Sequence, residues 1–148
     1  MPARRTRFGL DSSCLIALLS DWHIQHRKTL NSYEQLLAKG AQAVIPAHAL
    51  LECFSVLTRL PAPYRVQSEA ANLALRESFS RSALIAEMSP AEVWSAIDSV
   101  SLLGPGGGLV YDAVIAQCAA KAGATVLLTW NAKHFLRIAP AGLEVREP

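Results

Sequence analysis

Short apolar runs alternate with longer amphipathic stretches along the whole chain. The short runs have the length of buried strands; they lie at 8–10, 43–45, 83–86, 125–129 and 143–145. The longer stretches have the apolar spacing of helices that bury one face; they lie at 11–19, 26–39, 46–59, 66–79, 90–103 and 113–122. Because consecutive parallel strands need helical crossovers, this alternation predicts an α/β fold: a central parallel β-sheet of about five short strands flanked by helices.

Local signals mark where several of these helices begin and end. Ser89-Pro90-Ala91-Glu92 has the residues of a capping box with proline at the first helical position, and Pro46 fits the first turn of another helix. Gly40 and Gly123 follow helical stretches and are typical of helix C-termini. The loop 60–63 contains two prolines, which cannot continue the preceding helix. Each predicted helix is therefore short enough to connect two strands of one sheet.

The composition is that of a compact domain. The chain has 148 residues, of which 51% are hydrophobic and 18% charged, a balance that supports a buried core and argues against a disordered chain. A membrane-spanning helix needs about 20 apolar residues in succession, and the sequence has no such run. Asp11 interrupts the first apolar run before the core of a signal peptide can form. We therefore expect a cytoplasmic protein that does not contact a membrane.

Net charge and cysteine content narrow the function only slightly. The formal net charge of +2 is too small to indicate a nucleic-acid-binding protein by itself. Cys14, Cys53 and Cys118 are odd in number and form no C-x-x-C pair, so neither a disulfide framework nor a zinc site is indicated. We expect all three to be buried as small hydrophobic residues.

Three acidic residues stand where chemistry can occur. Asp11 follows the first strand and Asp112 opens a helix, and helix N-capping explains either one taken alone. Glu52 lies among apolar residues of the helix 46–59, where a carboxylate needs a cation such as Arg59 or a metal ion. Ligand sites of open α/β sheets lie at the carboxyl ends of the strands. Three carboxylates that meet there supply the oxygen ligands that Mg²⁺ or Mn²⁺ requires.

The segment after the strand 125–129 carries basic and aromatic side chains, which can hold phosphates and stack a base. These residues are Trp130, Lys133, His134 and Arg137. The same composition also fits a solvated helix start with one half-buried tryptophan. The glycine-rich stretch 104–108 is not a phosphate loop, because no Gly-Lys-Ser/Thr follows it. We expect it to be a flexible loop that lets Asp112 approach the site.

Four motifs together resemble the PIN domain family, and within it the toxins of the VapC type. They are Leu10-Asp11-Ser12-Ser13, Leu51-Glu52-Cys53-Phe54, Tyr111-Asp112-Ala113 and the segment 127–135. The resemblance extends over essentially the whole chain and implies a single PIN-like domain at 1–148. It also implies a metal-dependent endoribonuclease, a hydrolase that cleaves RNA phosphodiester bonds with Mg²⁺ (or Mn²⁺), acting as the toxin of a VapBC-type toxin–antitoxin pair.

The resemblance also implies roles for individual residues. Asp11, Glu52 and Asp112 match the acidic positions of the family, which makes them catalytic residues and metal ligands. Asn131 stands where many members have a fourth acid, and its neutral amide oxygen binds a hard cation more weakly, which makes it a secondary metal ligand. The residues expected to bind substrate are Ser13, Thr129, Lys133 and His134.

The partners implied are an RNA substrate, a cognate antitoxin protein and a second copy of the chain in a homodimer. Two alternatives stay open. The neutral Asn131 is also consistent with a catalytically weakened PIN-like interaction module, which a test of metal-dependent RNA cleavage would distinguish. A receiver-like signalling domain also carries an Asp at a strand end, but the paired acids typical of its first strand are absent here.

Overall fold

Five parallel strands form one sheet in the computed structural model, which describes residues 4–104 and 106–148. The strands are β1 (Arg7–Leu10), β2 (Gln42–Pro46), β3 (Leu84–Ala86), β4 (Val126–Leu128) and β5 (Glu144–Arg146). Their order across the sheet is β3-β2-β1-β4-β5, and each neighbouring pair is parallel. The predicted α/β class with a parallel sheet of five short strands is confirmed.

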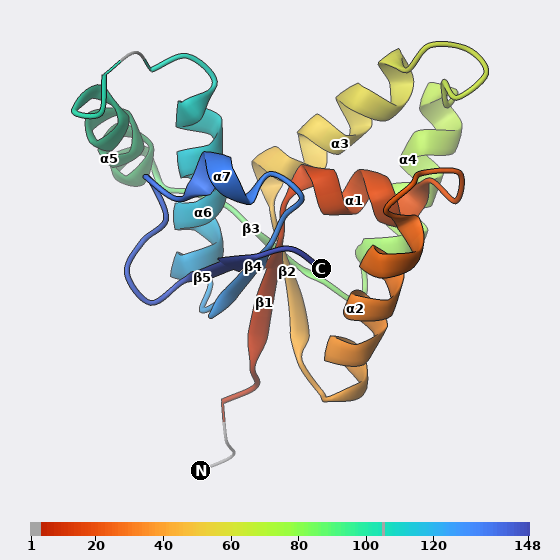
Figure 1. Ribbon diagram of the computed structural model, residues 1–148, viewed down its shortest axis with the longest axis horizontal. Coiled ribbons are helices and arrows are strands. Elements are labelled where there is room, and N and C mark those ends of the chain that lie inside the picture. Colours follow the sequence, from red (N-terminus) through yellow and green to blue (C-terminus); the bar gives the residue numbers. More distant parts are fainter. Residues whose placement is uncertain (1–3, 105) are drawn as a thin grey trace.

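Helices cover both faces of this sheet. In the described part of the chain they are α1 (Ser12–Leu19), α2 (His26–Ala38), α3 (Ala47–Arg59), α4 (Ser68–Phe79), α5 (Pro90–Ser101), α6 (Leu109–Lys121) and α7 (Ala132–Phe135). Figure 1 shows α1, α2 and α4 to one side of β1 and β2, and α5 and α6 to the other. Right-handed crossovers produce this division when the chain runs from β1 to β3 in one direction and then returns to the far side of β1.

Strands β1 and β4 flank the point where the chain changes direction across the sheet. β2 lies on one side of β1 and β4 on the other, so Asp11 after β1 and Thr129 after β4 are neighbours at the carboxyl edge. The backbone N–H of Asp11 donates to the carbonyl of Leu128 at 3.0 Å, which extends the β1–β4 ladder by one bond. Ligand sites of open α/β sheets form at such points. The topology therefore brings the first candidate residue to a position suited to a ligand.

The central strands are buried by helices on both faces. Their fully buried side chains include Phe8, Leu10, Ile45 and Leu127. Gly9 of β1 has no side chain, and a Cβ atom there would lie only 3.0 Å from the Cβ of Ala119 on α6. Glycine thus allows α6, the helix that carries Asp112, to pack closely against the sheet.

Two predicted helix starts are wrong. Pro46 does not lie in the first turn of α3, because it ends β2 and is the N-cap of a helix that begins at Ala47. Asp112 is not the N-cap of α6, since that helix begins at Leu109 with Gly108 as its N-cap. Gly108 has no side chain that could indicate an N-cap in the sequence, so the sequence predicts that the helix starts at Asp112, one turn later. The other element ends differ from the prediction by one or two residues, the usual variation at helix and strand termini.

Several local predictions are confirmed. Ser89 and Glu92 form both hydrogen bonds of the capping box of α5. Gly40 and Gly123 have φ angles of 82° and 88°, the left-handed conformation expected after a helix. All three cysteines are free and buried. Residue 105 of the predicted flexible loop 104–108 lies outside the described residues. No helix within the described ranges has the length and apolar character needed to cross a membrane.

Candidate active site

The carboxylate of Asp11, between β1 and α1, accepts three hydrogen bonds of 3.0 Å or shorter and a longer one, 3.4 Å, from the Ser12 hydroxyl. Its Oδ1 accepts the backbone N–H of Ser12 at 2.7 Å, which is the N-cap interaction expected at the start of α1. Its Oδ2 accepts the hydroxyls of Thr129 at 2.7 Å and Ser13 at 3.0 Å. The carboxylate is only 3% exposed, and burial raises its pKa although these hydrogen bonds oppose the rise. Asp11 is therefore an N-cap and also a rigidly oriented, buried acid.

Glu52 lies on α3 and has a partner for each carboxylate oxygen. Ser12 donates its hydroxyl to Oε2 at 2.8 Å, and His48, one turn earlier on α3, lies 2.8 Å from Oε1 through its Nε2. Because an ionised carboxylate only accepts hydrogen bonds, Nε2 of His48 carries the proton. Arg59, the cation considered as a partner, instead donates from Nε to the carbonyl of Ser55. Glu52 is thus oriented by a histidine and a serine.

Asp112 approaches the same region from the first turn of α6. Its Oδ2 lies 3.8 Å from Nδ1 of His134. The neighbouring Tyr111 stacks on the ring of His48, with ring centroids 4.8 Å apart and planes 7° from parallel. The stack joins α6 to α3, so the elements that carry Glu52 and Asp112 are linked by direct contact.

The three acids influence one another electrostatically. Burial, followed by the negative charge of Asp11, raises the pKa of Asp112 to about 6; Glu52 adds to the rise, while His134 opposes it. Glu52 also raises the pKa of Asp11. Asp11, Glu52 and Asp112 therefore lie near enough for their charges to interact, while their roles as metal ligands and catalytic residues stay predictions.

The predicted substrate residues Ser13 and Thr129 are already engaged within the protein. Besides their bonds to Asp11, the Ser13 hydroxyl accepts the backbone N–H of Trp130, and the Thr129 hydroxyl accepts that of Asn131, each at 3.0 Å. These bonds attach the β4–α7 turn to Asp11. The role of both hydroxyls in substrate binding stays a prediction, and their observed role is to position Asp11.

The remaining predicted residues surround this cluster. Lys133 and His134 are exposed on α7 and accessible to a substrate, and the side chain of Asn131 is also exposed. Trp130 is half-buried, and its Nε1 donates to the Thr29 hydroxyl at 2.9 Å, which fixes the indole against α2. Trp130 is thus half-buried, as expected if this segment is simply a solvated helix start. Its role in base stacking stays a prediction.

Ser12, His48 and Tyr111 contribute to the site without having been predicted to do so. His48 precedes Glu52 by four residues, the spacing of side chains that meet on one helix face, and this signal was available in the sequence. The stacking of Tyr111 on His48 joins residues far apart in the chain and had no local signal.

The three carboxylates are suited to a hard divalent cation that needs only a few ligands from the protein. Among the described residues, no group of three or more acidic, histidine or cysteine side chains is arranged so that it could hold a metal ion without further ligands. Mg²⁺ does not need one, because it keeps several of its waters and is held by one or two carboxylates together with substrate phosphates. Asp11, Glu52 and Asp112 supply carboxylate oxygens; burial, followed by the charge of Asp11, raises the pKa of Asp112, and a bound cation would compensate that charge.

An α/β domain with an acidic cluster at the carboxyl edge of its parallel sheet is the class that the fold and site define. Residues 9–140 match the family model of the PIN domain. The chain belongs to the PIN domain family, as its motifs indicated.

Characterised relatives and solved structures agree with this assignment. The chain is 32% identical over 117 residues to ribonuclease VapC40 of Mycobacterium tuberculosis, covering 79% of this chain and 81% of the relative. It is 30% identical over 113 residues to ribonuclease VapC27 of the same organism, covering 76% and 77%. Its fold is similar to that of VapBC2 from Rickettsia felis bound to a promoter DNA fragment, with a TM-score of 0.69, 20% identity and coverage of 97% and 99%. It is also similar to M. tuberculosis VapC20, a sarcin–ricin loop cleaving toxin, with a TM-score of 0.67, 16% identity and coverage of 86% and 92%.

The raised pKa of Asp112 predicts a specific pH dependence of stability. The folded-state pKa of about 6 lies above the ordinary value of 3.8, so the folded protein binds this proton more tightly than the unfolded chain does. The contribution of Asp112 to the free energy of unfolding therefore falls as pH rises from about 4 to 6. We expect Asp112→Asn to be more stable than the wild type by about 1–2 kcal/mol at pH 8, allowing for partial solvent screening.

Urea denaturation in the presence of a chelator measures this difference. It should become small near pH 4, where the acid is protonated in both states. Asp98→Asn on α5 is the matched control, because Asp98 is exposed and outside the cluster. An Asp112→Asn variant that is no more stable than the wild type at pH 8 would contradict the electrostatic account.

Proposed function

We propose that this protein is a cytoplasmic, Mg²⁺- or Mn²⁺-dependent endoribonuclease that acts as the toxin of a VapBC-type toxin–antitoxin pair. The observation that carries the proposal is the cluster of Asp11, Glu52 and Asp112 at the carboxyl edge of a PIN-domain sheet. The ribonuclease relatives at 32% and 30% identity support the reaction class. The VapBC assemblies among the similar structures support an antitoxin as partner.

The acidic residues have complementary parts in this activity. Asp11, Glu52 and Asp112 would hold the ion, which when bound supplies charge neutralisation for the phosphodiester and a water of lowered pKa. Asp11 provides a fixed carboxylate, because Ser12, Ser13 and Thr129 donate to it. Glu52 is oriented at both oxygens. Oriented groups need no rearrangement during the reaction, which is the advantage of a preorganised site.

The exposed basic side chains beside the cluster are suited to bind the phosphates of an RNA backbone. Lys133 and His134 lie on α7, and His134 approaches Asp112. Positive or hydrogen-bonding side chains next to the acids would hold the phosphates on either side of the cleaved bond. A weakened interaction module is the second candidate, favoured by one observation: Asn131 places a neutral amide where many family members have an acid.

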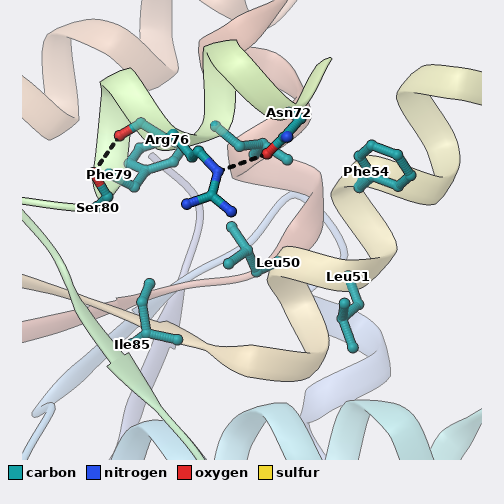
Figure 2. A pocket seen from close by; sticks show the side chains of 9 residues that line it. Leu50, Leu51, Phe54, Asn72, Arg76, Phe79, Ser80 and Ile85 are labelled. Atoms are coloured by element: carbon teal, nitrogen blue, oxygen red, sulfur yellow. Dashed lines mark hydrogen bonds between the residues drawn. The ribbon is translucent and has the colours of Figure 1, made fainter. Parts of the chain in front are cut away.

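A groove beside α3 and α4 supports self-association. Figure 2 shows aliphatic and aromatic side chains of α3, α4 and β3 around this groove. Its volume is about 300 Å³. Its lining includes Leu50, Leu51, Phe54, Phe79 and Ile85. Leu51 is 68% exposed and Ile85 40%, although both are apolar. Exposed apolar patches with a polar rim are typical of protein interfaces, and a twofold dimer would bury the same patch on both copies.

The first functional prediction concerns the acids. Asp11→Asn and Asp112→Asn each keep the shape of the side chain but remove the charge needed to hold a cation, so each should lower RNA cleavage by at least about a hundredfold. Gel-based cleavage in Mg²⁺ or Mn²⁺ measures the rate, and thermal melting checks the fold. Asp98→Asn should cleave at the wild-type rate. Full activity of both cluster variants, or cleavage unaffected by a chelator, would refute the proposal.

The second concerns Asn131, whose exposed amide can be removed without loss of the backbone bond to Thr129. Asn131→Ala should slow cleavage only about fivefold, the effect of one contact of roughly 1 kcal/mol. Asn131→Asp should tighten Mg²⁺ binding, because it restores a charged ligand. Metal titrations of the cleavage rate compare the three proteins. A collapse of the Ala variant that added Mn²⁺ does not restore would show that Asn131 has a primary role.

The third concerns the groove in Figure 2. Leu51→Glu places a charge in the centre of an apolar interface and should convert the dimer to a monomer at tens of micromolar, because a buried unpaired charge is strongly unfavourable. Sedimentation velocity measures the change, and Leu102→Glu, an exposed leucine outside the groove, is the control. A wild-type protein that sediments only as a monomer argues against the dimer and leaves the nuclease proposal intact.

A further inference from the structure

A second hollow, of about 400 Å³, opens beside the acidic cluster. It lies between α1, the loop that follows it, α3 and the β4–α7 turn. Its lining residues include Ser13, Trp22, His23, Gln25, Trp130 and Asn131. Ser13 and Asn131 are also part of the hydrogen-bond network around Asp11. The hollow is therefore continuous with the edge at which a phosphodiester would be cleaved.

Two indoles from distant segments line this hollow. Trp130 is fixed by its bond to Thr29. Trp22, from the α1–α2 loop, packs against Tyr64 of the α3–α4 loop with ring centroids 4.2 Å apart and ring planes tilted by 31°, yet 45% of it is exposed. A large aromatic residue left half exposed beside a reactive site provides a flat apolar surface for a ligand.

The rest of the lining combines the aliphatic residues Ile16, Val56 and Leu60 with polar side chains. His23, Gln25 and Asn131 offer hydrogen-bonding groups. Arg65 donates from Nε to the carbonyl of Leu60, a lining residue, at 2.9 Å, so its guanidinium lies at the rim. Flat aromatic surfaces, polar edges and a cation are the features that recognise a nucleotide: the base stacks, its edge forms hydrogen bonds, and its phosphate meets the positive charge.

We propose that this hollow is a subsite for one unpaired nucleobase of the RNA substrate, adjacent to the cleaved phosphodiester, with Trp22 as its principal stacking residue. The inference rests on the proposed function and specifies how that function selects single-stranded RNA. The volume lies within the range of small-ligand clefts, roughly 300–1,000 Å³. A duplex presents its bases already stacked and would gain nothing from the hollow, so the subsite favours loops and unpaired ends.

The hollow differs from the groove in Figure 2 in the chemistry of its lining. The groove is bordered mainly by aliphatic and phenylalanine side chains suited to a protein surface. The hollow combines indoles with polar groups and shares two residues with the Asp11 network. An apolar protein segment would leave His23, Gln25 and Asn131 without partners, whereas a base edge satisfies such groups.

Binding of RNA without cleavage tests the subsite. All variants are made in the Asp11→Asn background, and the probe is a fluorescein-labelled pool of random single-stranded RNA 12-mers read by fluorescence anisotropy. Trp22→Leu keeps apolar bulk but removes the flat face, and should weaken binding about 5- to 100-fold, the loss typical of one stacked base. Trp22→Phe retains a ring and should stay within about threefold of the parent. Trp94→Leu is the matched control, because Trp94 is an exposed tryptophan on α5, outside the hollow.

The outcomes separate this inference from the function on which it rests. In the otherwise native protein, Trp22→Leu should raise KM more than it lowers kcat, since the contact binds substrate without touching the reacting atoms. RNA affinity of Trp22→Leu equal to the parent, or an equal loss in Trp94→Leu, would overturn the subsite while native cleavage upholds the function. Loss of binding to a cognate antitoxin, with RNA affinity unchanged, would overturn it in favour of a protein-docking hollow. If the wild type neither binds nor cleaves RNA, the proposed function fails and the subsite fails with it.

Discussion

The burial of one carboxylate determines how the site is assembled. Asp11 is almost inaccessible to water, and a buried carboxylate is strongly unfavourable unless donors replace its hydration. Those donors come from the first turn of α1 and from the end of β4, two segments far apart in the chain. Satisfying Asp11 therefore requires α1 to start at Ser12 and β4 to end at Leu128, directly before Thr129. The same hydroxyls then hold the β4–α7 turn, which carries Trp130 and Asn131.

The arrangement of the acidic cluster lowers the stability of the folded domain and suits the cluster to bind a cation. Asp11, Glu52 and Asp112 are placed where their charges repel, and nearby histidines only partly compensate. Natural domains accept such unfavourable local arrangements mainly at functional sites, where the strain is offset elsewhere in the fold. Here the offset lies in the buried central strands beneath the cluster. An unfavourable acidic cluster on a stable core distinguishes this site from an ordinary group of helix N-caps.

Much of this architecture could be predicted from the sequence, because its signals are local. The alternation of apolar runs gave the five strands, and Ser89 with Glu92 marked a helix start unambiguously. Asp11 was recognisable from its place between a strand and a helix. The start of α6 was not, since Gly108 leaves no side-chain signal. Non-local contacts were also beyond reach: neither the stacking of Tyr111 on His48 nor the meeting of Trp22 with Tyr64 follows from spacing along the chain.

The uncapped start of α6 has a consequence for motion within the site. Gly108 offers no side-chain acceptor to the first N–H groups of the helix, so this turn lacks a source of local stability that α1 receives from Asp11. Local opening costs least where such contacts are missing, and here only backbone carbonyls, those of Gly106 and Gly108, accept the N–H groups of Leu109 and Tyr111. Asp112 thus belongs to a turn that can open briefly without unfolding the domain, whereas Asp11 is locked to the sheet. The stack of Tyr111 on His48 is the contact that holds this turn against α3.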